Sequence, residues 1–124
     1  MRKIRIVAEH SGVQATASLN ETKTAGAIWE KLPISSSAQR WGEEVYFDVP
    51  VHLPLEQAKA TVPSGALGYW PPGHAFCIFF GQTPYSPVNV IGRVEGDEKV
   101  FAKVKDGEPI RLERAEEAKA TPGA

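Results

Sequence analysis

Apolar and polar residues alternate over many short stretches of this chain, as they do in β-strands with one buried face. The first two stretches cover residues 2–8 and 13–19, and Ser11-Gly12 between them is typical of a tight turn. We therefore expect them to form an antiparallel hairpin. Further strands are predicted over residues 34–40, 43–49, 66–70, 75–80, 88–94 and 109–114. The pattern predicts seven or eight short strands.

One segment has the apolar periodicity of an amphipathic helix, because four apolar residues fall at i, i+3, i+4 and i+7. These are Ala25, Ile28, Trp29 and Leu32. We expect Asn20 to cap the start of this helix and Pro33 to end it, giving roughly 11 residues, an average helix length. A single helical turn is also expected over residues 55–60, after Pro54.

Glycine and proline interrupt the chain unusually often. They account for 21 of 124 residues (11 Gly and 10 Pro), or about 17% where roughly 12% is average. This favours a mainly β fold: a small closed antiparallel β-barrel of about eight strands, capped by one or two short helices. The length supports one domain over residues 1–114, followed by a flexible tail over residues 115–124. Eight of the 21 lie within residues 65–87, which we expect to shape a groove.

The charge balance excludes some classes of partner. With 14 basic and 15 acidic residues the net charge is −1, so nucleic-acid binding has no electrostatic basis. The single cysteine, Cys77, cannot form an internal disulfide and is interpreted as a small buried side chain. Glu9 and His10 interrupt the basic N-terminus too early for a signal peptide, and no stretch approaches about 18 apolar residues. We expect a cytoplasmic protein with no membrane partner, and the sequence carries no signal for its oligomeric state.

Motifs for catalysis or metal binding do not appear. There is no paired-cysteine metal spacing, no phosphate-binding glycine loop and no nucleophile elbow. The three histidines, His10, His52 and His74, lie far apart and are interpreted as solvated loop residues. No metal and no cofactor are therefore predicted.

Three segments, residues 40–47, 65–73 and 79–85, instead combine aromatic and polar side chains. In the first, alternation directs Glu44 and Tyr46 to the outer face of a strand, where they form either a polar ligand site or an ordinary solvated face. In the others, Trp70 and Phe80 either line a pocket or fill the barrel. The candidate ligand-binding residues are Arg40, Glu44, Tyr46, Tyr69, Trp70, Phe80 and Thr83.

These blocks resemble a family of small prokaryotic cyclophilin-like proteins. The likeness is carried by Trp-Gly-Glu-Glu-Val-Tyr-Phe at residues 41–47, by the Tyr-Trp-Pro-Pro-Gly and Phe-Phe-Gly-x-Thr-Pro blocks within residues 68–84, and by Val-Asn-Val-Ile-Gly at residues 88–92. It runs from about residue 2 to 114. The resemblance implies a cyclophilin-type barrel of about eight antiparallel strands, with an outer groove where true cyclophilins bind Xaa-Pro peptides.

Peptidyl-prolyl isomerases of that fold use an arginine in a Phe-His-Arg segment and a Phe-Met-x-Gln-Gly-Gly-Asp strand. Neither motif occurs here, and Arg40 is the one arginine beside a family block that could substitute. We therefore expect a module that binds a small polar molecule or a short peptide, and leave open whether it is an enzyme. The alternatives are a divergent peptidyl-prolyl isomerase, another enzyme such as a hydrolase or a metal-assisted one that uses His52 or His74 with Glu44, and a structural or partner-binding role.

Overall fold

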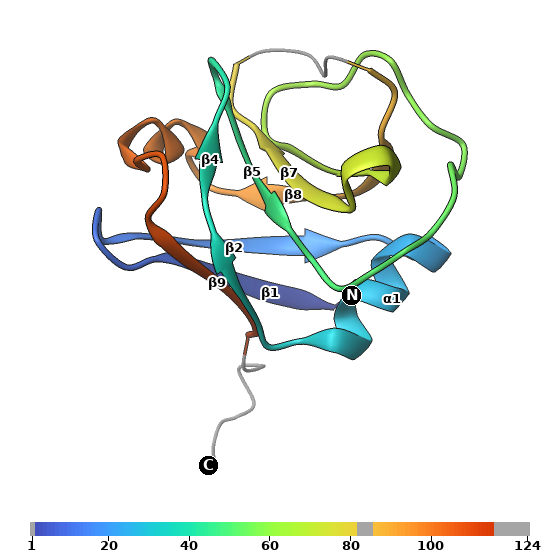
Figure 1. The fold of residues 1–124 in the computed structure, drawn as a ribbon, viewed down its shortest axis with the longest axis horizontal. Coiled ribbons are helices and arrows are strands. Elements are labelled where there is room, and N and C mark those ends of the chain that lie inside the picture. The colour runs from blue at the N-terminus through green and yellow to red at the C-terminus, as the bar shows by residue number, and fades with distance from the viewer. Residues whose placement is uncertain (1, 82–85, 116–124) are drawn as a thin grey trace.

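The computed structural model describes residues 2–81 and 86–115, so the expected tail over residues 115–124 lies almost wholly outside the described part. Within it, one antiparallel sheet contains nine strands (Figure 1). The strands are β1 (Lys3–Ala8), β2 (Val13–Leu19), β3 (Ile34–Ser37), β4 (Gln39–Arg40), β5 (Glu44–Asp48), β6 (Ala66–Trp70), β7 (Ala75–Phe79), β8 (Asn89–Glu95) and β9 (Pro109–Arg114). The mainly β class is confirmed.

The order of the strands closes the sheet on itself. It runs β3-β9-β1-β2-β8-β6-β7-β5-β4, so β3 and β4 are the two edges. Only Ala38 separates these two strands in sequence, and its backbone bonds to Glu108 and Gly107 in the chain before β9. A single extended stretch therefore pairs with both ends of the sheet and makes a nearly closed barrel. The expected strand over residues 34–40 is thus divided in two, which accounts for the ninth strand.

Helix α1 (Lys23–Lys31) lies at one end of β1 and β2 (Figure 1). The expectation that Asn20 caps it is wrong, because the cap is Thr22, whose hydroxyl accepts a hydrogen bond from the Ala25 N–H. Asn20 precedes the cap, and its side-chain oxygen accepts bonds from the Thr22 N–H and hydroxyl. The loop residue thus orients the cap, a turn function typical of asparagine.

Two short 3-10 helices, η1 (Pro71–Gly73) and η2 (Glu98–Lys103), complete the described elements. The helical turn expected over residues 55–60 is not formed. Glu56 in this segment instead turns its carboxylate to the start of α1, where it accepts hydrogen bonds from the Lys23 and Thr24 N–H groups at 3.0 Å each. None of the described helices is long and apolar enough to cross a bilayer.

Two apolar clusters are built on the sheet. The larger fills the barrel and includes Phe47 and Phe76, whose ring centroids lie 5.2 Å apart. The smaller lies on the opposite face of β6 and β7, and it consists of Val62, Ala66, Ala75, Cys77, Phe79 and Val88. Because β7 contributes to both clusters, all of its residues are buried, as its continuous apolar run predicts. The smaller cluster forms the floor of the candidate site.

Candidate functional site

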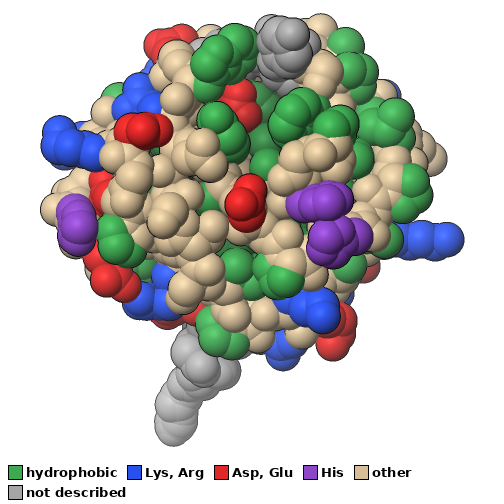
Figure 2. All heavy atoms as spheres, viewed as in Figure 1, with side chains coloured by type: hydrophobic (Ala, Val, Ile, Leu, Met, Phe, Trp, Pro, Cys, Tyr) green, Lys and Arg blue, Asp and Glu red, His purple; other side chains and the backbone are tan. Residues whose placement is uncertain are grey.

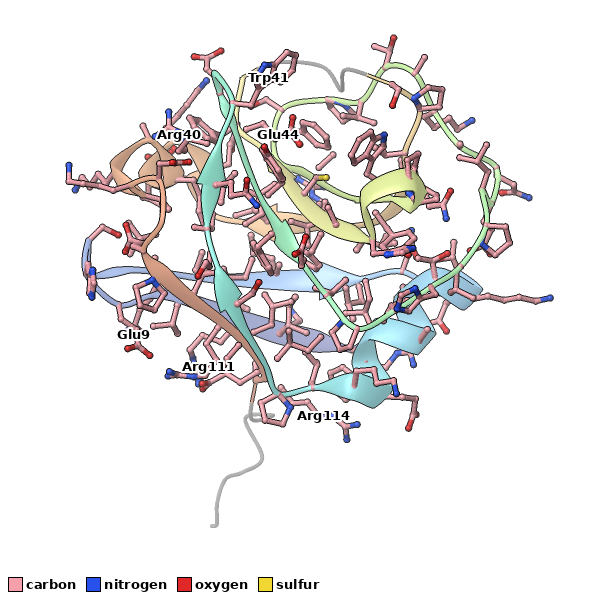
Figure 3. All side chains as sticks on the ribbon, in the orientation of Figure 1. Glu9, Arg40, Trp41, Glu44, Arg111 and Arg114 are labelled. Atoms are coloured by element: carbon pink, nitrogen blue, oxygen red, sulfur yellow. The ribbon has the colours of Figure 1, made fainter. Side chains whose placement is uncertain are left out.

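A pocket of about 250 Å³ opens on the outer face of β5 and β7. Figure 2 shows hydrophobic side chains gathered around a hollow in the upper part of the molecule, and Figure 3 shows Glu44 and Trp41 beside it. The described lining residues are Trp41, Glu44, Tyr46, Trp70, Cys77, Phe79, Ser86 and Val88. Four of the eight are aromatic, and Glu44 is the acidic member.

Strand alternation explains why these side chains meet. In β5, Val45 and Phe47 point into the barrel and are fully buried, so Glu44 and Tyr46 point outward. β7 is antiparallel to β5, with Glu44 opposite Phe79 and Tyr46 opposite Cys77. Side chains of directly opposed residues share one face of a sheet. The register therefore places a carboxylate, a phenol and a thiol on the pocket wall.

The carboxyl group of Glu44 is the most unusual feature of the wall. The residue is only 7% exposed, and burial among apolar side chains raises the pKa of its carboxyl group. A hydrogen bond with the Cys77 thiol lowers that pKa and offsets part of the effect. None of the ion pairs among the described residues involves Glu44. The pocket thus contains an acid that lacks a described cationic partner.

Cys77 has the opposite character to a reactive cysteine. It is 2% exposed, and burial raises the pKa of its thiol well above the usual range, with the neighbouring Glu44 raising it further. Because the thiolate is the nucleophilic form, the thiol is unreactive at neutral pH. Its role on the wall is that of a weak donor, which lies 3.8 Å from the Ala75 carbonyl oxygen and also contacts Glu44.

Trp70 is held at the mouth by a hydrogen bond from its indole N–H to the Ser86 hydroxyl. Gly73 packs against the same ring, since a Cβ there would lie 2.6 Å from both Cε3 and Cζ3 of Trp70. Gly68 has a similar role, because a Cβ at this position would lie 2.8 Å from Cγ2 of the lining residue Val88. Glycines in the block rich in turn residues therefore allow the pocket walls to approach closely.

The seven residues predicted for the site are divided by the structure. Glu44, Tyr46 and Trp70 line the pocket. Tyr69 points into the barrel and donates its hydroxyl to the Val51 carbonyl, and Phe80 is buried in the barrel cluster. Thr83 lies outside the described residues.

Arg40 lies away from the pocket. Its guanidinium donates to the carbonyl oxygens of Ala102, Val104 and Gly42 at 3.1, 2.9 and 2.8 Å, and packs 5.1 Å from the ring centroid of Phe80. Figure 3 shows Arg40 and Glu44 on opposite sides of the β4–β5 hairpin. Within the described chain, Arg40 therefore ties this hairpin to η2 and does not line the pocket.

Sequence reasoning did not select five of the lining residues, which are Trp41, Cys77, Phe79, Ser86 and Val88. Alternation within the apolar run 75–80 could have identified Cys77 and Phe79. Phe76 and Ile78 point into the barrel, so their neighbours Cys77 and Phe79 point to the outer face. Ser86 carried no such signal. Its place depends on contact with Trp70, 16 residues earlier.

Two of the three histidines meet on the surface. Nδ1 of His52 lies 3.2 Å from Nε2 of His74, and the two rings lie 4.0 Å apart between centroids. Both are surface loop residues, as expected, and they meet because the segment after β5 runs past the turn between β6 and β7. Among the described residues, no group of three or more His, Cys, Asp or Glu side chains could hold a metal ion.

A second hollow, of about 890 Å³, lies beside β2 and β8. It is lined by Ser18, Leu19, Asn20, Pro63, Ser64, Gly65, Ala66, Val90, Gly92, Arg93 and Glu95. The acid in this hollow is already paired, because the Glu95 carboxylate binds Lys3 Nζ at 2.6 Å. Its described lining residues include none of the predicted site residues and no aromatic side chain, so it has less of the character of a site for a small organic ligand.

A nearly closed antiparallel barrel with a helix at one end and a pocket on its outer face is a cyclophilin-type architecture. The sequence matches the family described as cyclophilin-like over residues 2–113, and the chain belongs to this family. The solution structure of the hypothetical protein AF2241 from Archaeoglobus fulgidus is similar, with 38% identity and a TM-score of 0.78 over 92% of this chain and 95% of that one. A search of curated proteins found no match.

McbB, solved in complex with tryptophan, has a similar fold. The TM-score is 0.78 at 19% identity, over 93% of this chain and 45% of the McbB chain. This chain thus spans less than half the length of McbB. At this identity the likeness concerns the fold alone.

Proposed function

We propose that this protein binds a small molecule with a flat apolar body and a hydrogen-bond-donating group in the pocket on β5 and β7. The observation that carries the proposal is the buried Glu44 carboxyl group on a wall otherwise made largely of aromatic and aliphatic side chains. An apolar pocket with few convergent polar groups is the usual form of a small-molecule site.

The size of the pocket favours a small molecule over a peptide. Its volume of about 250 Å³ lies below the ~300–1,000 Å³ typical of sites for drug-sized ligands. A short peptide would therefore enter through one side chain, while its backbone stayed at the mouth near Trp41. We expect the ligand itself to be a small metabolite.

The cyclophilin-like fold alone supplies no activity, since one fold can carry many functions. McbB has been solved with tryptophan, a molecule with a flat indole, an ammonium group and a carboxylate, and this makes tryptophan a sensible probe beside indole, which has no charged group. The isomerase alternative gains no support, because Arg40 is engaged with backbone carbonyls and no arginine is among the described lining residues.

The test is a binding screen that separates the two hollows. Thermal unfolding would be followed with indole, tryptophan and related compounds for the wild type, Tyr46→Ala and Arg93→Ala. A ligand at 100 times its Kd stabilises the folded state by about 2.7 kcal/mol. We expect this gain to be lost in Tyr46→Ala and kept in Arg93→Ala, which alters the second hollow. The reverse result, or no stabilising compound in the whole panel, would refute the proposal.

A further inference from the structure

We infer that the pocket selects organic cations: a protonated amine whose ammonium group meets the Glu44 carboxylate while its apolar body lies among the rings of Trp41, Tyr46 and Trp70. This inference rests on the proposed function and narrows its ligand to one chemical class. It follows from the charges, the hydrogen bonds and the aromatic content of the wall.

The charge of the ionised Glu44 has no described counterion. The cationic side chains of Arg40 and Lys99, which lie beside Phe80, are both engaged elsewhere. Arg40 binds three backbone carbonyls, and Lys99 donates from Nζ to the Phe80 carbonyl at 2.8 Å. A buried ionised carboxylate without a partner is costly. A ligand that brings a positive charge offsets this cost, whereas a ligand carboxylate increases it.

The hydrogen-bond inventory of the wall leads to the same class of ligand. An ionised carboxylate only accepts hydrogen bonds, with room for about four on its two oxygens. The single weak S–H donor of Cys77 is shared between Glu44 and the Ala75 carbonyl oxygen, and the Trp70 indole N–H is already bound to Ser86. The Tyr46 hydroxyl, also on the wall, can both donate and accept. The Glu44 carboxylate therefore still has oxygen lone pairs that can accept hydrogen bonds. An ammonium group, with several N–H donors, can supply these hydrogen bonds.

The aromatic lining of the pocket also favours a cationic ligand. Trp41, Tyr46, Trp70 and Phe79 all border the same small volume as Glu44. A cation within about 6 Å of an aromatic face gains from the negative charge on that face, most strongly with tryptophan. Aromatic side chains around one carboxylate thus favour an ammonium group over a neutral group of the same shape.

Three probes of matched shape test the inference: benzylamine, benzyl alcohol and benzyltrimethylammonium. Their affinities would be measured by amide chemical-shift titration of the wild type, Glu44→Gln and Glu30→Gln. Glu30 lies exposed on α1, so Glu30→Gln makes the same change in net charge away from the pocket. The titration also reports where each probe binds.

We expect benzylamine to bind the pocket of the wild type at least about tenfold more tightly than benzyl alcohol, a difference of about 1.4 kcal/mol. Glu44→Gln should remove this preference and Glu30→Gln should keep it. Benzyltrimethylammonium, which lacks N–H donors, should keep part of the preference through the rings alone.

Three results would overturn the inference, and they differ in whether the small-molecule site remains supported. Equal affinity of benzylamine and benzyl alcohol, with shifts at pocket residues, would exclude a cation-selective site while supporting the small-molecule site. Shifts confined to residues outside the pocket for all three probes would refute both. An amine preference that survives Glu44→Gln would also overturn the inference, because the selecting charge would then lie elsewhere.

Discussion

Glu44 and Cys77 occupy diagonal positions on the adjacent antiparallel strands β5 and β7, and each alters the acidity of the other. Their opposite partners are Phe79 and Tyr46, so the two side chains meet on the outer face of the sheet. The thiol lowers the pKa of the carboxyl group, while the carboxylate raises the pKa of the thiol. This contact makes the Glu44 charge and the Cys77 reactivity measurable reporters of the pocket.

The first prediction concerns the pH dependence of stability. Burial raises the pKa of Glu44 in the folded state, so the folded protein binds this proton more tightly than the unfolded chain. The resulting stabilisation is complete below the unfolded pKa and is lost as the pH rises through the folded pKa. The side chain introduced by Glu44→Gln stays neutral at every pH. We therefore expect the free energy of unfolding of this variant at pH 8 to exceed that of the wild type by on the order of 1 kcal/mol.

Urea unfolding at several pH values between 4 and 8 would measure this difference. The gain from Glu44→Gln should shrink as the pH falls and Glu44 becomes protonated in the wild type. A gain that stays constant with pH would show that packing, and not the buried charge, is responsible.

The second prediction concerns the reactivity of Cys77. Burial and the neighbouring carboxylate both disfavour the thiolate, so alkylation by iodoacetamide at pH 8 should be at least about tenfold slower in the folded protein than in urea. Glu44→Gln removes the neighbouring charge and should speed the reaction of the folded protein. An equal rate in folded and unfolded protein would contradict the buried position. Mass spectrometry would follow the single cysteine directly.

Sequence alternation predicted the faces of short strands well, because side-chain direction along a strand is a local property. It placed Glu44 and Tyr46 together on the outer face of β5. It did not separate Tyr69 from Trp70, although neighbours in a strand must point to opposite faces. Tyr69 fills the barrel and Trp70 lines the pocket.

The remaining parts of the site depend on contacts that are distant in sequence. Arg40 adjoins the pocket residue Trp41, yet its guanidinium binds carbonyls of residues 102 and 104, which no local pattern reveals. The meeting of His52 with His74 has the same origin, since it depends on the path of the segment after β5. The high glycine content, by contrast, is explained in part by the site, because Gly68 and Gly73 let the backbone approach the lining residues Val88 and Trp70 closely.

The third prediction tests the cap that the loop supplies to α1. The Glu56 carboxylate accepts hydrogen bonds from the Thr24 hydroxyl and from the Lys23 and Thr24 N–H groups, and these bonds lower its pKa, the hydroxyl most strongly. Replacing a capping acceptor typically costs about 0.5–2 kcal/mol. We expect the free energy of unfolding of Glu56→Ala at pH 7 to be lower than that of the wild type by about that amount.

The pH dependence of Glu56 has the opposite sign to that of Glu44. A lowered folded pKa stabilises the protein above the unfolded pKa, and this contribution is lost as the pH falls through the folded pKa. In urea unfolding, the difference in the free energy of unfolding between the wild type and Glu56→Ala should therefore become smaller toward low pH. A deficit that persisted unchanged in acid would show that the carboxylate charge is not what stabilises the helix.

The fourth prediction compares two glycines. A Cβ at Gly73 would lie 2.6 Å from two ring carbons of Trp70, so Gly73→Ala must displace the indole and should cost about 1–3 kcal/mol. Gly26 lies inside α1, where the nearest atoms to a new Cβ are those of Arg2 at 3.8 Å. Gly26→Ala should stabilise the protein by about 0.5–1 kcal/mol, because alanine is the better helix former.

Thermal unfolding and tryptophan fluorescence together would test this pair. Gly73→Ala should also shift the emission of the displaced indole and weaken ligand binding in the pocket, whereas Gly26→Ala should do neither. Unchanged stability and emission in Gly73→Ala would contradict the close packing of Gly73 on Trp70.

The last prediction assigns Arg40 a structural role. Its planar guanidinium joins three backbone carbonyls from the β4–β5 hairpin and from the η2 region, a geometry that a lysine ammonium cannot reproduce. Arg40→Ala leaves these acceptors without their donor and should lower the free energy of unfolding by about 1–3 kcal/mol. Arg40→Lys should recover less than half of that loss. Benzylamine should still bind both variants, because Arg40 is not among the described lining residues and acts on the pocket only through the hairpin that carries Trp41 and Glu44. A proline-peptide isomerisation assay decides against this role if the wild type accelerates the reaction and Arg40→Ala abolishes that activity without loss of stability.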